Sequence, residues 1–261
     1  MKHGKFDTDT SALKQRIECH EKYGSHDLNQ WIFDHLELDQ GLLILDLGCG
    51  TGKQTLPLAQ IIGDTGHVFA LDISEEALNA LSESAKIIGV ERRITLLHCG
   101  LDDLPKHLNE PVFDRVQSCY SLYYAQYPRR VLEQVFRILK TGGVFFFCGP
   151  GKDNNLELKQ FHYALRAERV PDEEGTAPKF MEETGQQMAR EIFTEIEVFT
   201  FQNPLRFDSA EALYDYWSSY NLYDEKLAAD FKVAADKHFR THSVFETVKR
   251  VIGVRAVKRS V

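Results

Sequence analysis

The stretch Asp46-Leu47-Gly48-Cys49-Gly50-Thr51-Gly52 overlaps the end of a short apolar run, Leu43–Leu47, and precedes a segment with helical spacing, Thr55–Ile62. An apolar run that ends in glycines and leads into a helix is typical of the first strand–turn–helix unit of an α/β fold. Glycines at this point allow the backbone to turn tightly and to approach a ligand closely. This stretch therefore predicts the fold class and the place of a ligand.

Strand-like and helix-like segments alternate on both sides of residue 100. We expect strands at Val68–Leu71, Ile94–Cys99, Asp114–Cys119 and Val144–Cys148, and helices at Glu75–Ile88 and Arg129–Leu139. Beyond residue 149 the pattern predicts helices over Asn155–Glu168, Glu182–Ile192 and Ser209 to about His238, a mobile loop over Val170–Lys179, and strands at Glu195–Phe201 and Val248–Val257. Such alternation predicts βαβ units and a doubly wound, mostly parallel α/β sheet with helical insertions, all in a single domain.

Composition excludes several classes of protein. The net charge of −8 gives no general attraction to nucleic acid, so no nucleic-acid partner is expected. No apolar run approaches the roughly 20 residues of a membrane helix, and residues 1–10 do not resemble a signal peptide, so a cytoplasmic location is expected. The five cysteines are odd in number and none forms a CxxC pair, so neither disulfides nor a metal site are predicted.

Two acids flank the glycine stretch and narrow the class of ligand. Asp72 ends the second expected strand, where a carboxylate can accept both hydroxyls of a ribose. Asp46 lies two residues before the first glycine, where it disfavours a pyrophosphate and suits an ammonium group. The spacing is GxGxG rather than the GxGxxG of dinucleotide-binding folds. A ligand with an amino-acid group and a ribose is therefore favoured.

The segment Leu45–Gly52 (LDLGCGTG) resembles the S-adenosylmethionine (SAM) loop of class I methyltransferases. Phe113–Val116 and Arg137–Gly143 resemble two further family blocks, with Thr141 in place of the usual proline. The resemblance covers roughly the first 150 residues. It implies a Rossmann-like, seven-stranded sheet whose last strand is antiparallel, and SAM at the carboxyl ends of the strands, with S-adenosylhomocysteine as product. It divides the domain into a SAM-binding core over about 22–150 and helical caps over about 151–192 and 205–245.

The same resemblance implies a set of cofactor contacts. These are Tyr23, Asp46, Gly48, Cys49, Gly50, Thr51, Gly52, Gln54, Asp72, Ile73, Leu101, Asp102 and Ser118. The family often carries an acid that binds the adenine amino group, and this chain has Gly100 at that position. Either Asp102 takes the place of that acid, or backbone groups alone bind the adenine. Tyr23 either touches the SAM carboxylate or packs within an amphipathic helix.

The methyl acceptor is expected beyond the fourth strand, but no strong catalytic signature is present. Tyr120 and His162 are candidates for a catalytic role, with packing as the alternative for each. Tyr123, Tyr124 and Trp217 are candidates for substrate contacts, and core packing is the alternative favoured for any single one of them. The Asn/Asp-Pro-Pro-Tyr/Phe motif of nucleobase methyltransferases is absent here, and Asn203-Pro204 predicts a turn after the sixth strand.

Three functions remain open at this point. The leading hypothesis is an enzyme that transfers a methyl group from SAM to O, N or C of a small molecule. The first alternative is an RNA or protein methyltransferase, which requires a basic or extended groove. The second is a SAM-binding protein without turnover. The sequence leaves the oligomeric state open.

Overall fold

The computed structural model describes residues 15, 18–20, 22–104, 110–171 and 175–259. Its elements, in chain order, are α3 (Leu28–Leu36), β1 (Leu43–Leu47), α4 (Thr55–Ile61), β2 (His67–Asp72), α5 (Glu75–Ile88), η1 (Glu91–Arg93), β3 (Ile94–His98), η2 (Leu101–Asp103), β4 (Phe113–Cys119), η3 (Leu122–Tyr124), α6 (Pro128–Ile138), β5 (Leu139–Pro150), α7 (Leu156–Ala164), α8 (Thr176–Lys179), η4 (Phe180–Thr184), α9 (Gly185–Ile192), β6 (Glu195–Phe207), α10 (Ala210–Ser218), η5 (Glu225–Leu227), α11 (Ala228–Phe239) and β7 (Phe245–Val257). Among the described helices, none combines the length and the apolar character needed to cross a membrane.

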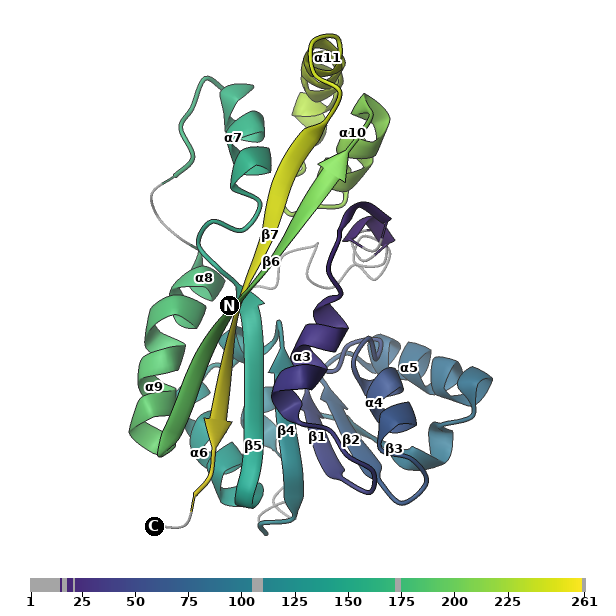
Figure 1. Cartoon of the computed structure of the whole chain (residues 1–261), viewed down its shortest axis with the longest axis vertical. Helices are drawn as coiled ribbons and strands as arrows, with labels where there is room; N and C mark the ends of the chain where they lie inside the picture. Colours follow the sequence, from purple (N-terminus) through teal and green to yellow (C-terminus); the bar gives the residue numbers. More distant parts are fainter. Residues whose placement is uncertain (1–14, 16–17, 21, 105–109, 172–174, 260–261) are drawn as a thin grey trace. The chain divides into compact units, whose positions relative to one another are not determined.

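The seven strands form one sheet in the order β3-β2-β1-β4-β5-β7-β6. β1 pairs in parallel with both β2 and β4, and the pairs β2–β3 and β4–β5 are parallel as well (Figure 1). The prediction of a mostly parallel, doubly wound sheet is confirmed. The strand order reverses between β1 and β4, which is where doubly wound folds bind their ligands.

β7 runs antiparallel to β5. The Gly142 N–H donates to the carbonyl of Lys258 at 2.7 Å, and the Lys258 N–H donates to the carbonyl of Gly143 at 3.0 Å. The beginning of β5 therefore lies beside the residues that follow β7, which is possible only if the two strands run in opposite directions. This agrees with the antiparallel last strand that the family resemblance implies.

Three consecutive phenylalanines of β5 show how the sheet is covered on both faces. Phe146 points to one face, where its ring lies 5.5 Å from that of Trp31 in α3. Phe145 and Phe147 stack on each other on the opposite face, and Phe145 lies 6.1 Å from Phe193, the residue after α9. All three phenylalanines are fully buried. Side chains alternate along a strand, so this apolar run has to be covered on both sides.

The chain forms two compact units. The sheet unit comprises Leu28–Gly151, Gly175–Thr200 and Ile252–Val261, and the second unit comprises Met1–Asp27, Lys152–Glu174 and Phe201–Val251. β6 and β7 each contribute residues to both units. The second unit has its own core, in which Trp217 is fully buried and stacks on Phe231 with the ring centroids 4.1 Å apart. The interpretation of the late helices as caps of a single domain stays a prediction.

Three segments differ from the sequence-based expectations. The helix expected over Ser209–His238 is two helices, α10 and α11, because Asp224 accepts the N–H of Lys226 and starts the separate turn η5. The expected turn at Asn203-Pro204 lies inside β6, which is the edge strand of the sheet, where proline is tolerated because one side of the strand needs no partner. Of the loop expected over Val170–Lys179, Thr176–Lys179 is helical and residues 172–174 lie outside the described residues.

Candidate functional site

The glycine loop after β1 uses its three glycines for two different purposes. All three have positive φ angles, +75° at Gly48, +54° at Gly50 and +89° at Gly52, which favour glycine. A Cβ on Gly48 would lie 2.3 Å from the Cβ of Ser121, and one on Gly52 would lie 2.3 Å from Leu81 Cδ1. A Cβ on Gly50 would meet nothing within 4 Å. The outer glycines therefore allow close packing, and the middle one faces open space.

Two serines of the β4 end hold the entry of this loop. Ser121 Oγ donates to the carbonyl of Leu47 at 2.6 Å, and Ser118 Oγ lies 2.6 Å from Ser121 Oγ. Both serines are buried, Ser118 completely. The structure thus places Ser118 beneath the loop, where it supports the backbone conformation of Gly48.

Asp72 at the end of β2 binds the same loop from the neighbouring strand. Its Oδ2 accepts the N–H of Gly50 at 2.8 Å, and its Oδ1 accepts the N–H of Ser74 at 2.9 Å. A carboxylate offers about four acceptor positions, so Asp72 keeps capacity for two ligand hydroxyls. Ile73 follows with 64% of its side chain exposed, which is unusual for an isoleucine beside a buried strand.

Asp46 lies beneath the loop as a buried acid. It is 2% exposed and accepts a hydrogen bond from Thr55 Oγ1 at 2.6 Å. Burial raises the pKa of Asp46 to about 6, although the Thr55 hydrogen bond lowers it. Gln117 faces Asp46 across the β1–β4 pair, and its fully buried amide lacks a well-formed hydrogen bond to any described residue.

The two acids make this edge of the sheet a site for a cation. Neither Asp46 nor Asp72 forms an ion pair with a described residue, and Asp72 contributes to the raised pKa of Asp46. A buried carboxylate without a cationic partner is costly, so a positively charged ligand group would stabilise it. The two acids and the open space at Gly50 fit a ligand that carries an ammonium group.

Asp102, the candidate for adenine contact, has backbone partners. Its two carboxylate oxygens accept the N–H groups of Gln126 and Tyr127 at 2.7 and 2.8 Å, directly before α6. Leu101 is half-buried beside it, and a Cβ on Gly100 would lie 3.9 Å from Ile73 Cδ1. Asp102 therefore anchors a loop, and its contact with adenine stays a prediction.

A family model described as a methyltransferase domain matches residues 38–197, which is more than half of the chain. The chain belongs to this methyltransferase family. SAM is the cofactor of this family, and a solved structure of a SAM dependent methyltransferase from Aquifex aeolicus aligns with a TM-score of 0.53 at 18% identity, over 73% of this chain and 89% of that one.

Two curated relatives are named as methyltransferases. The demethylmenaquinone methyltransferase of Anoxybacillus flavithermus is 29% identical over 129 residues, 49% of this chain and 53% of the relative. The ubiquinone/menaquinone biosynthesis C-methyltransferase UbiE of Vibrio campbellii is 31% identical over 103 residues, 40% of this chain and 39% of the relative. The methyltransferase chain thus spans about half, or less, of the length of these curated relatives.

A solved structure supports the fold alone. The phosphoethanolamine N-methyltransferase 2 of Haemonchus contortus aligns with a TM-score of 0.60 at 15% identity, over 98% of this chain and 58% of that one. At this identity the likeness shows how the methyltransferase folds and carries no information on its acceptor.

The end of β4 carries the tyrosines that were expected near the acceptor. Tyr120 has a φ of +59°, and its N–H donates to the carbonyl of Cys148 at 2.8 Å. Tyr123 is 7% exposed and lies 4.8 Å from the ring of Tyr124, which is 37% exposed. Phe180 of η4 lies 6.4 Å from Tyr123 on its other side. The structure brings the rings of Tyr123, Tyr124 and Phe180 together, within the sheet unit.

Three predicted site residues belong to the second unit of the methyltransferase instead. Tyr23 packs on Phe207 at 4.9 Å between ring centroids. His162 is buried, and its Nδ1 accepts the Trp217 indole N–H at 3.3 Å, so the neutral ring carries its proton on Nε2. Burial lowers the pKa of His162, with Arg166 adding to the effect. The functional roles predicted for these residues stay predictions.

Sequence reasoning missed two residues of the site, Gln117 and Asn29. Gln117 has no motif of its own, and only the pairing of β4 with β1 places it opposite Asp46. Asn29 lies in α3, outside every family block quoted above, and binds the exit of the glycine loop. The remaining contacts predicted from the resemblance, Cys49, Thr51 and Gln54, all lie in or directly after the loop.

Proposed function

We propose that this chain is a SAM-dependent methyltransferase that transfers a methyl group to a small-molecule acceptor and releases S-adenosylhomocysteine. The observation that carries the proposal is the glycine loop, which faces open space at Gly50 and is flanked by two acids that form no ion pair with any described residue. Membership in the methyltransferase family supports the same cofactor.

Each part of the cofactor has a partner of matching chemistry. Gly48–Gly52 would hold the amino-acid moiety, Asp46 would attract its ammonium group, and Asp72 would accept the ribose hydroxyls. Ile73, with its exposed side chain, offers an apolar surface for the adenine next to Leu101. The acceptor would then bind at the end of β4, where Tyr123 and Tyr124 lie.

The residues of this chain hold and orient the reactants. SAM, when bound, supplies an activated methyl group whose transfer is a displacement at a sulfonium. The protein's part is to align the acceptor and to exclude water, for which the rings of Tyr123, Tyr124 and Phe180 provide an apolar wall. The Tyr120 hydroxyl is the candidate that would accept or donate a proton at the acceptor.

For the acceptor we propose a planar, apolar compound such as a demethylated quinone. The aromatic wall at the β4 end supports this class, and two curated relatives bear the names of quinone methyltransferases. The test is an incubation with methyl-labelled SAM and demethylmenaquinone, with total RNA and with a protein extract in separate reactions. Label in the quinone supports the proposal, label in RNA or protein supports the macromolecular alternative, and tight S-adenosylhomocysteine binding without any labelled product indicates a non-catalytic protein.

Cofactor binding is expected to weaken in acid. Because burial raises the pKa of Asp46 to about 6, this group is protonated below that pH and cannot pair with the ligand's ammonium. The Kd for S-adenosylhomocysteine should rise by up to tenfold per pH unit below about 6. Calorimetric titrations between pH 5 and 7 measure this, and Asp46→Asn is the control with a flat profile. An equal slope in wild type and Asp46→Asn would remove Asp46 from the ammonium site.

The raised pKa of Asp46 also makes the stability of the ligand-free protein depend on pH. A raised pKa means that the folded state prefers the protonated acid. Asp46 therefore contributes stability below its unfolded pKa of 3.8, and this contribution is lost as the pH rises towards about 6. Ligand should stabilise the protein most where Asp46 is charged, above pH 6.

A further inference from the structure

The exit of the glycine loop is held by one side chain from α3. Asn29 Nδ2 donates to the carbonyl of Lys53 at 3.1 Å, and Asn29 Oδ1 accepts from Gln54 Nε2 at 2.9 Å. A single amide thus binds both the backbone and the side chain of the two residues that follow Gly52. Each contact is specific to an amide, because one needs a donor and the other an acceptor.

The other fixed points of the loop come from the sheet. The N–H groups of Gly48 and Cys49 both donate to the carbonyl of Leu71 at 2.7 and 2.9 Å, and Asp72 holds Gly50. These contacts fix the entry and the middle of the loop. Asn29 fixes the exit, from outside the sheet, so the loop is held at both ends.

The helix that carries Asn29 is itself fixed along its length. Ile32 and Leu36 are fully buried, and a Cβ on Gly253 of β7 would lie 2.5 Å from Trp31 Cη2. His35 lies 4.0 Å from Phe199 of β6 between ring centroids. Close packing of this kind leaves little freedom for α3 to slide or rotate.

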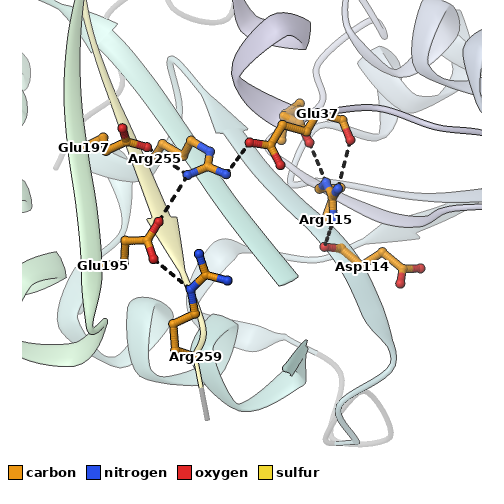
Figure 2. Close-up of polar contacts among 8 residues, drawn as sticks. Glu37, Asp114, Arg115, Glu195, Glu197, Arg255 and Arg259 are labelled. Carbon is orange, nitrogen blue, oxygen red and sulfur yellow. Dashed lines mark hydrogen bonds and ion pairs between the residues drawn. The ribbon is translucent and has the colours of Figure 1, made fainter. Parts of the chain in front are cut away.

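Two arginines bind the C-terminal end of α3, as Figure 2 shows. Arg115 of β4 donates to the carbonyls of Leu36 and Glu37, which α3 leaves without partners in the helix. The Glu37 carboxylate pairs with Arg255, which is only 11% exposed and also binds Glu197 at 2.8 Å (Figure 2). The helix therefore presents Asn29 to the loop from a preset position, and a preset contact costs little ordering entropy when it forms.

We propose that Asn29 is a positioning residue for the cofactor loop. It holds the Lys53–Gln54 segment so that Gly48–Gly52 keeps, in the ligand-free protein, the conformation that receives the amino-acid end of the cofactor. This inference rests on the proposed function, because it takes the ligand of the loop to be SAM.

The test compares Asn29→Ala with a matched change on the same helix. Gln30→Ala removes the neighbouring amide, which binds Asp34 within α3 instead of the loop. The Kd for S-adenosylhomocysteine, measured by calorimetry, should rise about five- to tenfold in Asn29→Ala, as expected for two lost hydrogen bonds. Gln30→Ala should bind like wild type, and the ligand-free unfolding temperatures of the two variants should agree within about 3 °C. Asn29→Asp keeps the acceptor for Gln54 and loses the donor to Lys53, so its Kd should lie between those of wild type and Asn29→Ala.

Hydrogen exchange gives a second readout that general destabilisation would not produce. Amides of residues 48–54 should exchange faster in Asn29→Ala, while those of β5 exchange as in wild type. A Kd for Asn29→Ala within twofold of wild type, or an equal loss in Gln30→Ala, would overturn the inference. Wild type that fails to bind S-adenosylhomocysteine would overturn the proposed function itself, a result that the wild-type titration alone reveals.

Discussion

Alanine at Gly50 is expected to weaken S-adenosylhomocysteine binding about ten- to a hundredfold while the protein stays folded. The new Cβ meets no atom of the described residues within 4 Å, so it extends into the space that the cofactor would occupy. Overfilling a site of this kind costs about 1–3 kcal/mol, which corresponds to that range of Kd. The positive φ angle adds about 1 kcal/mol of backbone strain. Calorimetry of binding together with chemical denaturation separates the two effects.

Gly48→Ala is the matched control, and we expect it to reduce the stability of the fold. Here the Cβ would lie 2.3 Å from the Cβ of Ser121, a position that no small rotation relieves. Strain and overpacking together should lower the free energy of unfolding by about 3 kcal/mol. If Gly50→Ala bound the ligand as wild type does, the open space at Gly50 would not be the cofactor site.

Replacement of Asp72 by alanine is expected to weaken cofactor binding by about 2–3 kcal/mol, or roughly 30- to 150-fold in Kd. Two losses add up in this variant. The ribose loses its charged acceptor, and the N–H groups of Gly50 and Ser74 lose theirs, which loosens the loop. Titration with S-adenosylhomocysteine measures the effect.

Asparagine at position 72 removes the charge but can keep only one of the two backbone contacts. It keeps the shape of the side chain and one acceptor oxygen, so it can still hold the Gly50 N–H, but it carries no charge. We expect its Kd to lie between those of wild type and Asp72→Ala. A change below about threefold in Asp72→Ala would show that the ribose binds elsewhere.

The sheet could be predicted because its signals are local. Each parallel strand is a short apolar run bounded by turn residues, and the glycine stretch after β1 marks the ligand edge. The carboxyl ends of β1 and β2 place Asp46 and Asp72 on either side of the loop, as their positions in the sequence predicted. The acids and the glycines could therefore be identified from the sequence alone.

The contacts between distant segments could not be predicted, because they depend on pairing and packing. The partner of Asp46 across the strands is known only when β4 is placed beside β1. Asp102 was a candidate for contact with the adenine, yet its two carboxylate oxygens accept N–H groups 24 and 25 residues further along the chain. Asn203 was predicted to start a turn, but its side-chain Oδ1 accepts the N–H groups of Ser25 and His26. Local propensity depends on neighbouring residues only, so it does not predict partners that are distant in the sequence.

The place of β7 in the sheet has a consequence for synthesis of the chain on the ribosome. β7 is the last strand in the sequence, yet it lies between β5 and β6. Until Phe245–Val257 has emerged, the long apolar edge of β5 has no neighbour on that side and β6 has no partner strand. An unpaired edge rich in phenylalanine is prone to intermolecular association. We therefore expect the nascent chain to expose this edge until β7 is inserted, so chaperone binding during translation should be concentrated on β5.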